Sequence, residues 1–351
     1  MSKVYFVPID SYSKTKEINS AVKLLAEKVN TTEKVINLTE QLALKIHTGE
    51  DGNITFIEPK NFDSLIDWLA KKSTAKKEPK IYFTETNALY KGERTIRSTH
   101  LELAKKHGFT KIPIIIADGE FGEDYSLIDY TKENLKHFKK FKIGKQIAQA
   151  SQMIVLAHFK GHPIAGFGGA LKQLSMGCAA RGGKLDMHAH SKPLINPLQC
   201  KKCMTCVKNC PTDSCIIDLI PHINYNTCIG CAKCSAVCPH DAIKINWAST
   251  GKKEFLEKLV EYAYAAQKGK RIIYINLLLN ITKDCDCFDT KMKPIAKDIG
   301  VLASTDPVAL DAACTDLLKK YHGKMPFGGK YALEYAEKIG IGSAKYELVN
   351  L

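Results

Sequence analysis

Residues 200–211 read CKKCMTCVKNCP, and residues 228–239 read CIGCAKCSAVCP. Each run spaces its cysteines as C-x2-C-x2-C-x3-C-P, and the second run begins 28 residues after the first. This spacing is typical of chains that hold two 4Fe–4S clusters, in which the fourth cysteine of each run binds the cluster of the other run. It assigns Cys200, Cys203, Cys206 and Cys238 to a first cluster, and Cys228, Cys231, Cys234 and Cys210 to a second.

Two other uses of so many cysteines fit the pattern less well. Zinc sites take four ligands, in pairs along the chain, and would leave the triple spacing unexplained. Disulfide frameworks are typical of small secreted chains rather than of a chain of 351 residues. We therefore predict a bacterial-type two-cluster ferredoxin module. Cys215 falls where the second repeat has Ile243, so we expect it to be a small buried residue and not a ligand.

The composition is that of a soluble globular protein, with 45% hydrophobic and 25% charged residues. The first residues, MSKVYFVPID, resemble a strand and not a signal peptide. No apolar run reaches the roughly 20 residues that span a bilayer. Thirteen cysteines without a secretory signal fit metal ligation in a reducing compartment. We predict a cytoplasmic protein with no membrane span.

The formal net charge is +14, and two thiolate-bound clusters would lower it to roughly +10. The lysines are scattered along the chain, and no nucleic-acid-binding motif accompanies them. A basic surface of this kind suits docking to an acidic redox partner, either a low-potential carrier or an oxidoreductase. We expect such a partner and no nucleic acid, and we leave assembly into a homo-oligomer open.

Strand-like and helix-like segments alternate on both sides of the cysteine module. The expected strands are 3–9, 35–38, 43–49, 54–57, 80–85, 112–118, 152–158 and 270–280. The expected helices are 14–29, 61–72, 98–107, 168–180, 252–267, 306–321 and 329–338. This alternation predicts an α/β fold with a mostly parallel sheet.

The cysteine module interrupts this α/β host. We predict a first host part at 1–195, the ferredoxin-like insertion at 196–246 and a second host part at 247–351. The host fixes the position of a module that is inserted into one of its loops. An insertion therefore favours directed electron delivery over a free carrier.

Ligands of open α/β sheets bind beyond the carboxyl ends of the strands. The most distinctive segment at such an end is HPIAGFGGALK, from His162 to Lys172. Its glycines, Gly166, Gly168 and Gly169, would let backbone N–H groups approach an anion at the start of a helix. The segment matches neither a P-loop nor a dinucleotide fingerprint, and a tight strand-to-helix connection is the alternative. We predict an anion or cofactor site here, with Lys172 as the anchor and His162 as a proton donor.

A second unusual segment follows the strand at 270–280, where Cys285 and Cys287 form a C-x-C pair. The two thiols could ligate a further metal or a cluster edge, together with Cys178, or form a redox-active pair. Two ordinary cytosolic thiols are the alternative. Cys314 lies in an apolar helical pattern and is expected in the core.

With these residues in view, the chain resembles the uncharacterised iron–sulfur centre proteins, the domain-of-unknown-function family numbered 362, in a form with an inserted two-cluster ferredoxin. The resemblance implies a cluster-binding protein of prokaryotic type whose activity is unsettled. It rests on the cysteine module and on KIHTGEDGN (45–53), ALYKGERT (88–95), HGFTKIPIIIADG (107–119), HFKGHPIAGFGGALKQLSMGCAARGGK (158–184), CDCF (285–288) and DIGVLASTDPVALD (298–311).

A more distant similarity links HPIAGFGGALK to the corresponding segment of the nickel-pincer lactate racemase. In that family a histidine acts as acid and base, a lysine tethers the pincer cofactor and a later histidine binds nickel. The resemblance places His162, Lys172 and His188 in those roles. Inserted clusters are not part of the racemase pattern, and racemisation needs no net electron flow.

Three functions follow from these patterns. The first is a redox protein that passes electrons through two 4Fe–4S clusters to a substrate or cofactor in the α/β cleft. The second is a non-catalytic electron-transfer or adaptor protein, and the third is a nickel-pincer-type racemase or epimerase. The first assigns His162, Lys172, His188, Cys285 and Cys287 to the cleft, and leaves a further metal or small-molecule cofactor open.

Overall fold

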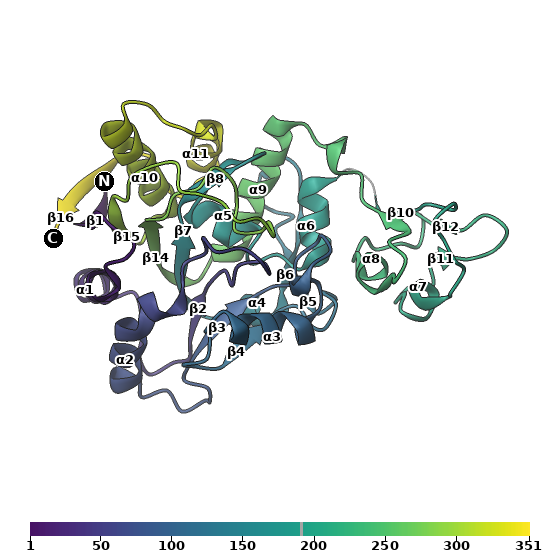
Figure 1. Cartoon of the computed structure of the whole chain (residues 1–351), viewed down its shortest axis with the longest axis horizontal. Coiled ribbons are helices and arrows are strands. Elements are labelled where there is room, and N and C mark those ends of the chain that lie inside the picture. Colours follow the sequence, from purple (N-terminus) through teal and green to yellow (C-terminus); the bar gives the residue numbers. More distant parts are fainter. Residues whose placement is uncertain (190–191) are drawn as a thin grey trace.

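A computed structural model describes residues 1–189 and 192–351, without the side chain of Ala248. Its body is one large sheet with helices on both faces (Figure 1). β15 is antiparallel to both of its neighbours, and all other neighbours are parallel, which confirms the predicted α/β fold with a mostly parallel sheet. In order across the sheet the strands are β16 (Tyr346–Asn350), β1 (Ser2–Pro8), β15 (Gly300–Ser304), β14 (Arg271–Leu278), β7 (Gln152–His158), β2 (Leu42–Lys45), β3 (Ile81–Glu85) and β4 (Ile114–Ile116).

Helices cover both faces of the sheet, so its central strands are mostly apolar. In β7, Met153 and Val155 join one core and Ile154 and Leu156 the other, as the two-residue period of a strand requires. The first core includes residues of α5 (Ala170–Ser175), α9 (Lys252–Gln267), α10 (Pro307–His322) and α11 (Lys330–Lys338). The second includes residues of α1 (Thr15–Glu33), α2 (Asp63–Lys72) and α3 (Arg97–Lys106).

Shorter elements connect these layers. Two hairpins are β5 (Tyr125–Asp129) with β6 (Lys140–Gly144), and β8 (Lys160–His162) with β9 (Gly166–Gly168). The short helices are η1 (Pro59–Phe62), η2 (Glu93–Thr95), α4 (Lys145–Gln149), α6 (Arg181–His188) and η3 (Trp247–Ser249). None of the helices within 1–189 and 192–351 has both the length and the apolar character that crossing a membrane would require.

The strands expected at 35–38 and 54–57 are wrong. In both segments, side chains form hydrogen bonds with the backbone groups that would otherwise pair with a neighbouring strand. At 35–38, the Gln152 side chain accepts from the Asn37 N–H at 2.8 Å and donates to its carbonyl at 2.8 Å. At 54–57, the Asn53 side-chain oxygen accepts the N–H groups of Thr55 and Phe56 at 2.9 and 3.0 Å. Local side-chain hydrogen bonds of this kind compete with sheet ladders.

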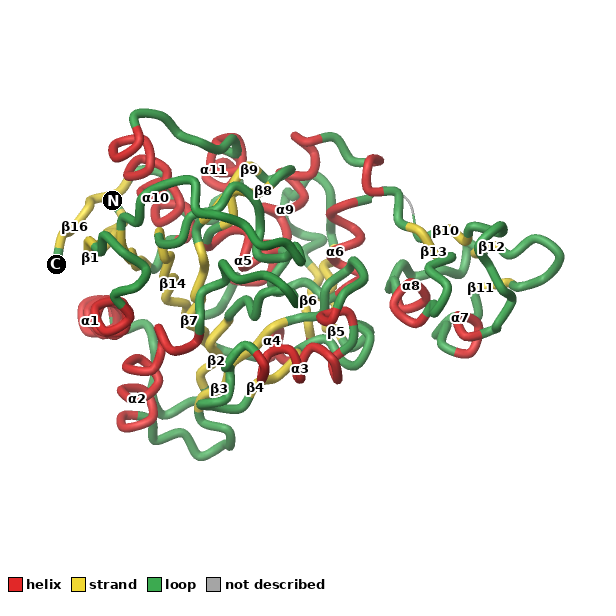
Figure 2. The backbone as a smooth tube through the Cα atoms, viewed as in Figure 1, coloured by secondary structure: helices red, strands yellow, loops and turns green. Residues whose placement is uncertain are grey.

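The cysteine module forms a small body at the end of the molecule opposite the two termini (Figures 1 and 2). Three backbone positions with left-handed conformation recur 28 residues later, where Lys202, Met204 and Asp213 correspond to Gly230, Ala232 and Asp241. The two halves of the module therefore share these backbone conformations. Its elements are β10 (Leu194–Ile195) paired with β13 (Ile243–Lys244), β11 (Cys215–Ile216) paired with β12 (His222–Ile223), α7 (Thr205–Lys208) and α8 (Lys233–Val237).

Candidate functional site

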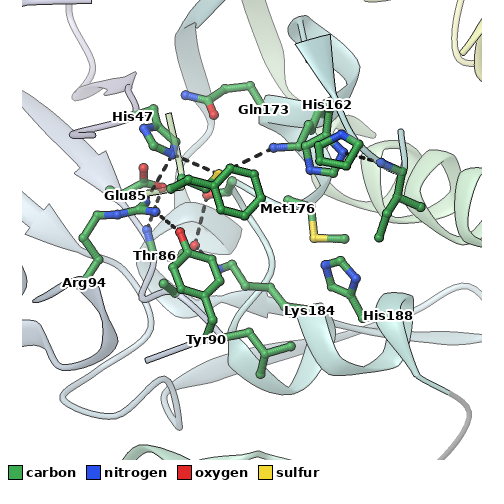
Figure 3. A pocket seen from close by; sticks show the side chains of 18 of the residues that line it. His47, Glu85, Thr86, Tyr90, Arg94, His162, Gln173, Met176, Lys184 and His188 are labelled. Carbon is green, nitrogen blue, oxygen red and sulfur yellow. Dashed lines mark hydrogen bonds between the residues drawn. The ribbon is translucent and has the colours of Figure 1, made fainter. Parts of the chain in front are cut away.

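A cavity of about 340 Å³ lies beyond the carboxyl ends of β2, β3, β7 and β14. Figure 3 shows His47, Glu85 and Arg94 on one side of it and Lys184 and His188 on the other. The cavity is lined by His47, Glu85, Thr86, Ala88, Leu89, Tyr90, Arg94, His162, Pro163, Ile164, Lys172, Gln173, Met176, Gly177, Lys184, His188, Trp247, Cys287 and Phe288. Its wall thus combines cations and histidines with a larger apolar surface.

A buried ion pair lies behind this wall. Lys45 is the last residue of β2, and its Nζ lies 2.7 Å from Glu85 Oε1 at the end of β3. Burial raises the pKa of Glu85, but the charge of Lys45, together with that of Arg94, outweighs it and holds the pKa at about 2. Glu85 is therefore ionised. Its second oxygen, Oε2, is buried and has no hydrogen-bond partner among the described residues.

A group of sulfur and nitrogen atoms, the thiol corner, forms one end of the cavity. The ligand atoms of His47, Cys285 and Cys287 all lie within 4.8 Å of one another. Lys172 Nζ donates to the thiol corner, at 3.3 Å from Cys285 Sγ and 3.9 Å from Cys287 Sγ. The structure does not bring Cys178 into this group; Cys178 is fully buried and donates to the carbonyl of Gln173 instead.

The two thiols of the thiol corner differ in protonation. A hydrogen bond from Cys285 holds the pKa of Cys287 well below its usual value, and the charges of Lys172 and Arg94 act in the same direction. The same hydrogen bond raises the pKa of Cys285 to about 12. Cys287 is therefore the thiolate, and it is the one of the two that lines the cavity.

Arg94 connects the thiol corner to the rest of the wall. Its Nε lies 3.3 Å from Glu50 Oε2, its NH1 lies 3.2 Å from His47 Nε2, and its NH2 donates to the Tyr90 hydroxyl. Burial, and then the charge of Arg94, lowers the pKa of His47 to about 3. His47 is therefore neutral beside a thiolate and a guanidinium.

Lys184, on α6, is a buried cation on the opposite wall. Its Nζ donates to Thr86 Oγ1 and to the Ala179 carbonyl, each at 2.6 Å. Burial lowers the pKa of Lys184 to about 8, and the carboxyl group of Asp118 opposes this shift. Neither hydrogen-bond partner is a carboxylate, so Lys184 presents a charge that an anion in the cavity could balance.

Two of the histidines predicted for the site also line the cavity. His162 Nδ1 accepts the N–H groups of Ala165 and Ile164 at 2.9 and 3.3 Å, so its ring proton is on Nε2. Burial, with the charge of Lys172, keeps the pKa of His162 well below its ordinary value. His188 packs edge-on against Trp247, and burial lowers its pKa to about 3. Both rings are neutral.

The glycine segment is not the helix-opening loop that the sequence suggested. Gly166 and Gly168 lie in the strand β9, and none of Gly166, Gly168 and Gly169 lines the cavity. The first N–H groups of α5, from Ala170 and Leu171, are accepted by the carboxylate of Asp311 at 2.8 and 3.0 Å. That carboxylate occupies the position where an anion was expected. The expected single helix at 168–180 is also wrong, since α5 ends at Ser175 and α6 begins at Arg181.

Replacing Asp311 with alanine should lower the free energy of unfolding by roughly 2–4 kcal/mol. Asp311 is fully buried, and the change leaves the N–H groups of Ala170 and Leu171 and the amide of Asn276 without an acceptor. Urea denaturation would measure the loss. Asp316→Ala on the exposed side of the same helix is the control and should cost less than about 1 kcal/mol. Equal costs for the two variants would contradict this role of Asp311.

In the module, cysteines of the two runs lie close to one another. Four thiols from both runs surround one small cavity of about 20 Å³: Cys200, Cys203, Cys206 and Cys238. The thiolates of Cys228 and Cys210 add to the effect of burial in raising the pKa of Cys231, so Cys210 lies near the second run. Cys215 is buried between the runs, and Cys314 lies in the host core, as expected.

The second cysteine run lies against α6 and the loop after β3. Arg181, the first residue of α6, donates to the Ala232 carbonyl at 3.3 Å and to Ser235 Oγ at 3.0 Å. Its other nitrogen donates to the Ala88 carbonyl. Ala232 also packs with Leu89 and with Leu185 of α6. The two segments that contact the second run, α6 and the loop after β3, therefore also form part of the cavity wall.

Sequence reasoning missed several residues of the site. His47 follows β2 and Glu85 is the last residue of β3, and only their place at strand ends could have indicated them. Lys184 and Arg181 were missed because α6 was not predicted as a separate helix. Tyr90 and Met176 lie in segments on which the family resemblance rests, but nothing in those segments marked these two residues as part of a cavity wall.

A family model described as a domain of unknown function, DUF362, matches residues 42–316. The chain belongs to this family. It is also 37% identical, over 70 residues, to a protein of Halobacterium salinarum that is provisionally named as an iron–sulfur subunit of dimethyl sulfoxide reductase. That match covers 19% of this chain and 24% of the relative.

Two solved structures align with this chain at low similarity. The lactate racemase apoprotein of Thermoanaerobacterium thermosaccharolyticum aligns with a TM-score of 0.46 and 15% identity, over 90% of this chain and 56% of that protein. A Thermotoga maritima protein aligns with a TM-score of 0.43 and 10% identity, over 93% of this chain and 59% of that one. Neither likeness is close enough to assign a function.

Proposed function

We propose that this chain is an iron–sulfur redox protein that passes electrons through two 4Fe–4S clusters to a ligand in the 340 Å³ cavity. Cys200, Cys203, Cys206 and Cys238 would hold one cluster, and Cys228, Cys231, Cys234 and Cys210 the other. Such clusters supply one-electron chemistry at potentials set by charge, hydrogen bonds and exposure. The name of the Halobacterium relative supports the assignment of iron–sulfur clusters to this chain.

The proposal rests on one observation, which is that α6 contacts both the second cysteine run and the cavity. At its start, Arg181 contacts Ala232 and Ser235 of the second cysteine run. Further along the helix, Lys184 and His188 line the cavity. One short helix thus joins the second cysteine group to the ligand site, and a free carrier would have no reason to bury a cationic cavity beside its cysteines.

The residues of the cavity suit an organic anion that is being reduced. Among the described residues Lys184 has no carboxylate as a hydrogen-bond partner, and the Nε2 proton of His162 is available to a bound group. Ile164, Met176 and Trp247 form apolar wall, which excludes water and strengthens these polar contacts. The chain itself would therefore bind and orient a ligand, and His162 would donate a hydrogen bond to it.

An electron-delivery experiment tests this proposal. The cluster-loaded protein is photoreduced and mixed, without oxygen, with the small-molecule fraction of the cells that produce it. Recovery of the visible absorbance of the clusters then reports the loss of electrons. Met176→Trp should fill part of the cavity and slow this recovery by roughly tenfold or more, with unchanged iron content.

The control is Leu24→Trp, on the outer surface of α1, which should leave the recovery rate unchanged. Equal rates in the wild type and Met176→Trp would contradict delivery through the cavity. They would favour the alternative of an electron-transfer or adaptor protein that loses electrons from the module alone.

One observation favours a nickel-pincer-type racemase or epimerase as a second candidate. His162, Lys172 and His188, the three residues that the resemblance assigned, all line the same cavity. Lys172, however, donates to the Cys285 thiol at 3.3 Å, so its amino group is engaged by the thiol corner in this structure. Anaerobically purified protein that holds iron but no nickel would exclude this function.

A further inference from the structure

The thiol corner contains a donor set that the proposed electron delivery leaves unused. The ligand atoms of His47, Cys285 and Cys287 are mutually within 4.8 Å, and His47 Nε2 lies 3.6 Å from Cys287 Sγ. We propose that these three residues bind one thiophilic divalent transition-metal ion, of the kind of Zn²⁺, Ni²⁺ or Fe²⁺, with an open coordination position toward the cavity. This site goes beyond the proposed function and is separate from the eight module cysteines.

The donor set itself argues for such an ion. Thiolate sulfur and imidazole nitrogen suit zinc, nickel and iron, whereas magnesium and calcium take oxygen ligands. Two cysteines and one histidine, with a fourth position left for water or substrate, form one of the known patterns of catalytic zinc. Here His47 and Cys287 line the cavity, while Cys285 is fully buried behind them. An ion between the three would therefore face the cavity.

The loops that carry the three ligands are tied to each other. Asp286, between the two cysteines, is fully buried and binds His158 at 2.9 Å and Lys160 at 3.2 Å. Its carbonyl accepts the Glu50 N–H at 3.1 Å, which joins the C-x-C segment to the loop of His47. These contacts hold the ligands together before an ion binds, and preorganised ligands of this kind raise metal affinity.

Two neighbouring contacts must change when the ion binds. A metal on His47 Nε2 replaces the contact with Arg94 NH1, and Arg94 keeps Glu50 at 3.3 Å and the Tyr90 hydroxyl. The ring proton then lies on Nδ1, where the Gly49 N–H now points at 3.0 Å. Gly49 has a φ of +76°, which glycine adopts at low cost, and we expect this peptide to turn. Lys172 stays as a donor to the two sulfur atoms.

Metal analysis of the full-length, cluster-loaded protein tests the site. The protein is purified without oxygen, incubated with Zn²⁺ or with Ni²⁺ alone and desalted, and the retained ion is counted by mass spectrometry. We expect about one ion per chain. X-ray absorption at the zinc edge should show two sulfur atoms at about 2.3 Å and one nitrogen at about 2.0–2.1 Å.

Two variants and two controls make the assignment specific. The double variant Cys285→Ser/Cys287→Ser should lose the ion but keep the cluster iron and absorbance, which also shows that it folds. His47→Gln removes one of the three direct ligands and should weaken binding by at least the roughly tenfold to hundredfold that loss of a ligand's own hydrogen-bond partner causes. Cys178→Ser, a buried thiol outside the group, and His188→Ala, a cavity histidine outside it, should retain the ion.

Three results would overturn the site: no retained ion, equal retention by the double variant, or loss of nickel in His188→Ala alone. A disulfide between Cys285 and Cys287 in anaerobic protein, seen by mass spectrometry after alkylation, would also overturn it and assign the pair to thiol redox chemistry. None of these results changes the rate of cluster reoxidation in Met176→Trp. Failure of the metal site and failure of electron delivery are therefore distinguishable.

Discussion

Cys238→Ser is expected to remove the cluster of the first cysteine run, although Cys238 belongs to the second. Cys238 lines the same small cavity as Cys200, Cys203 and Cys206. Serine is a poor ligand for iron, so a cubane left with three thiolates should be lost during purification. The iron content should fall from about eight to about four atoms per chain. Iron analysis and electron paramagnetic resonance of the reduced protein would measure this loss.

A further spectroscopic signal is needed to identify which of the two clusters is lost. Arg181 adjoins the second run, so Arg181→Met should change the resonance of the second cluster alone. In Cys238→Ser this Arg181-sensitive signal should remain, and in Cys210→Ser it should disappear. Cys215→Ser is the matched control, because Cys215 is buried between the runs without being an expected ligand. Loss of the Arg181-sensitive signal in Cys238→Ser would show that each run holds its own cluster.

The features that the sequence predicted correctly are local ones. The cysteine runs repeat in sequence, and the left-handed positions at Met204 and Ala232 repeat with them. Buried parallel strands such as β7 and β14 are nearly continuous apolar runs, which can be recognised without knowledge of their partners. The C-x-C pair and Lys172 were each noted from the sequence, and the structure places them in contact.

The features that were missed depend on contacts between distant residues. The start of α5 is not an anion site because Asp311, 140 residues further along the chain than Leu171, accepts its N–H groups. His47 joins the thiol corner from a loop that lies 240 residues before Cys287. β15 and β16 were not predicted, and each is completed by pairing with β1 at the other end of the chain. Period and spacing carry no information on such pairings.

Lys45→Met is expected to destabilise the protein by about 3–5 kcal/mol at neutral pH, because it leaves a buried carboxylate without its partner. Lys45 and Glu85 are both buried, with 2.7 Å between Nζ and Oε1. The free energy of unfolding would be measured by urea denaturation with tryptophan fluorescence. The matched double variant Lys45→Met/Glu85→Gln also removes the carboxylate charge that Lys45→Met leaves unpaired. It should therefore recover most of the lost free energy of unfolding.

The pH dependence separates a lost charge pair from lost packing. The folded pKa of Glu85, about 2, lies below its ordinary value of 4.5, so the ionised carboxylate contributes stability that is complete above pH 4.5 and is lost as the pH falls toward 2. Without Lys45 the folded pKa of Glu85 rises, since the cation that opposes burial is gone. The difference between wild type and Lys45→Met should therefore be largest above pH 4.5 and shrink as the pH falls below it. A difference that stays constant over this range would mean that the methylene chain of Lys45 stabilises the protein by packing, and that its charge does not.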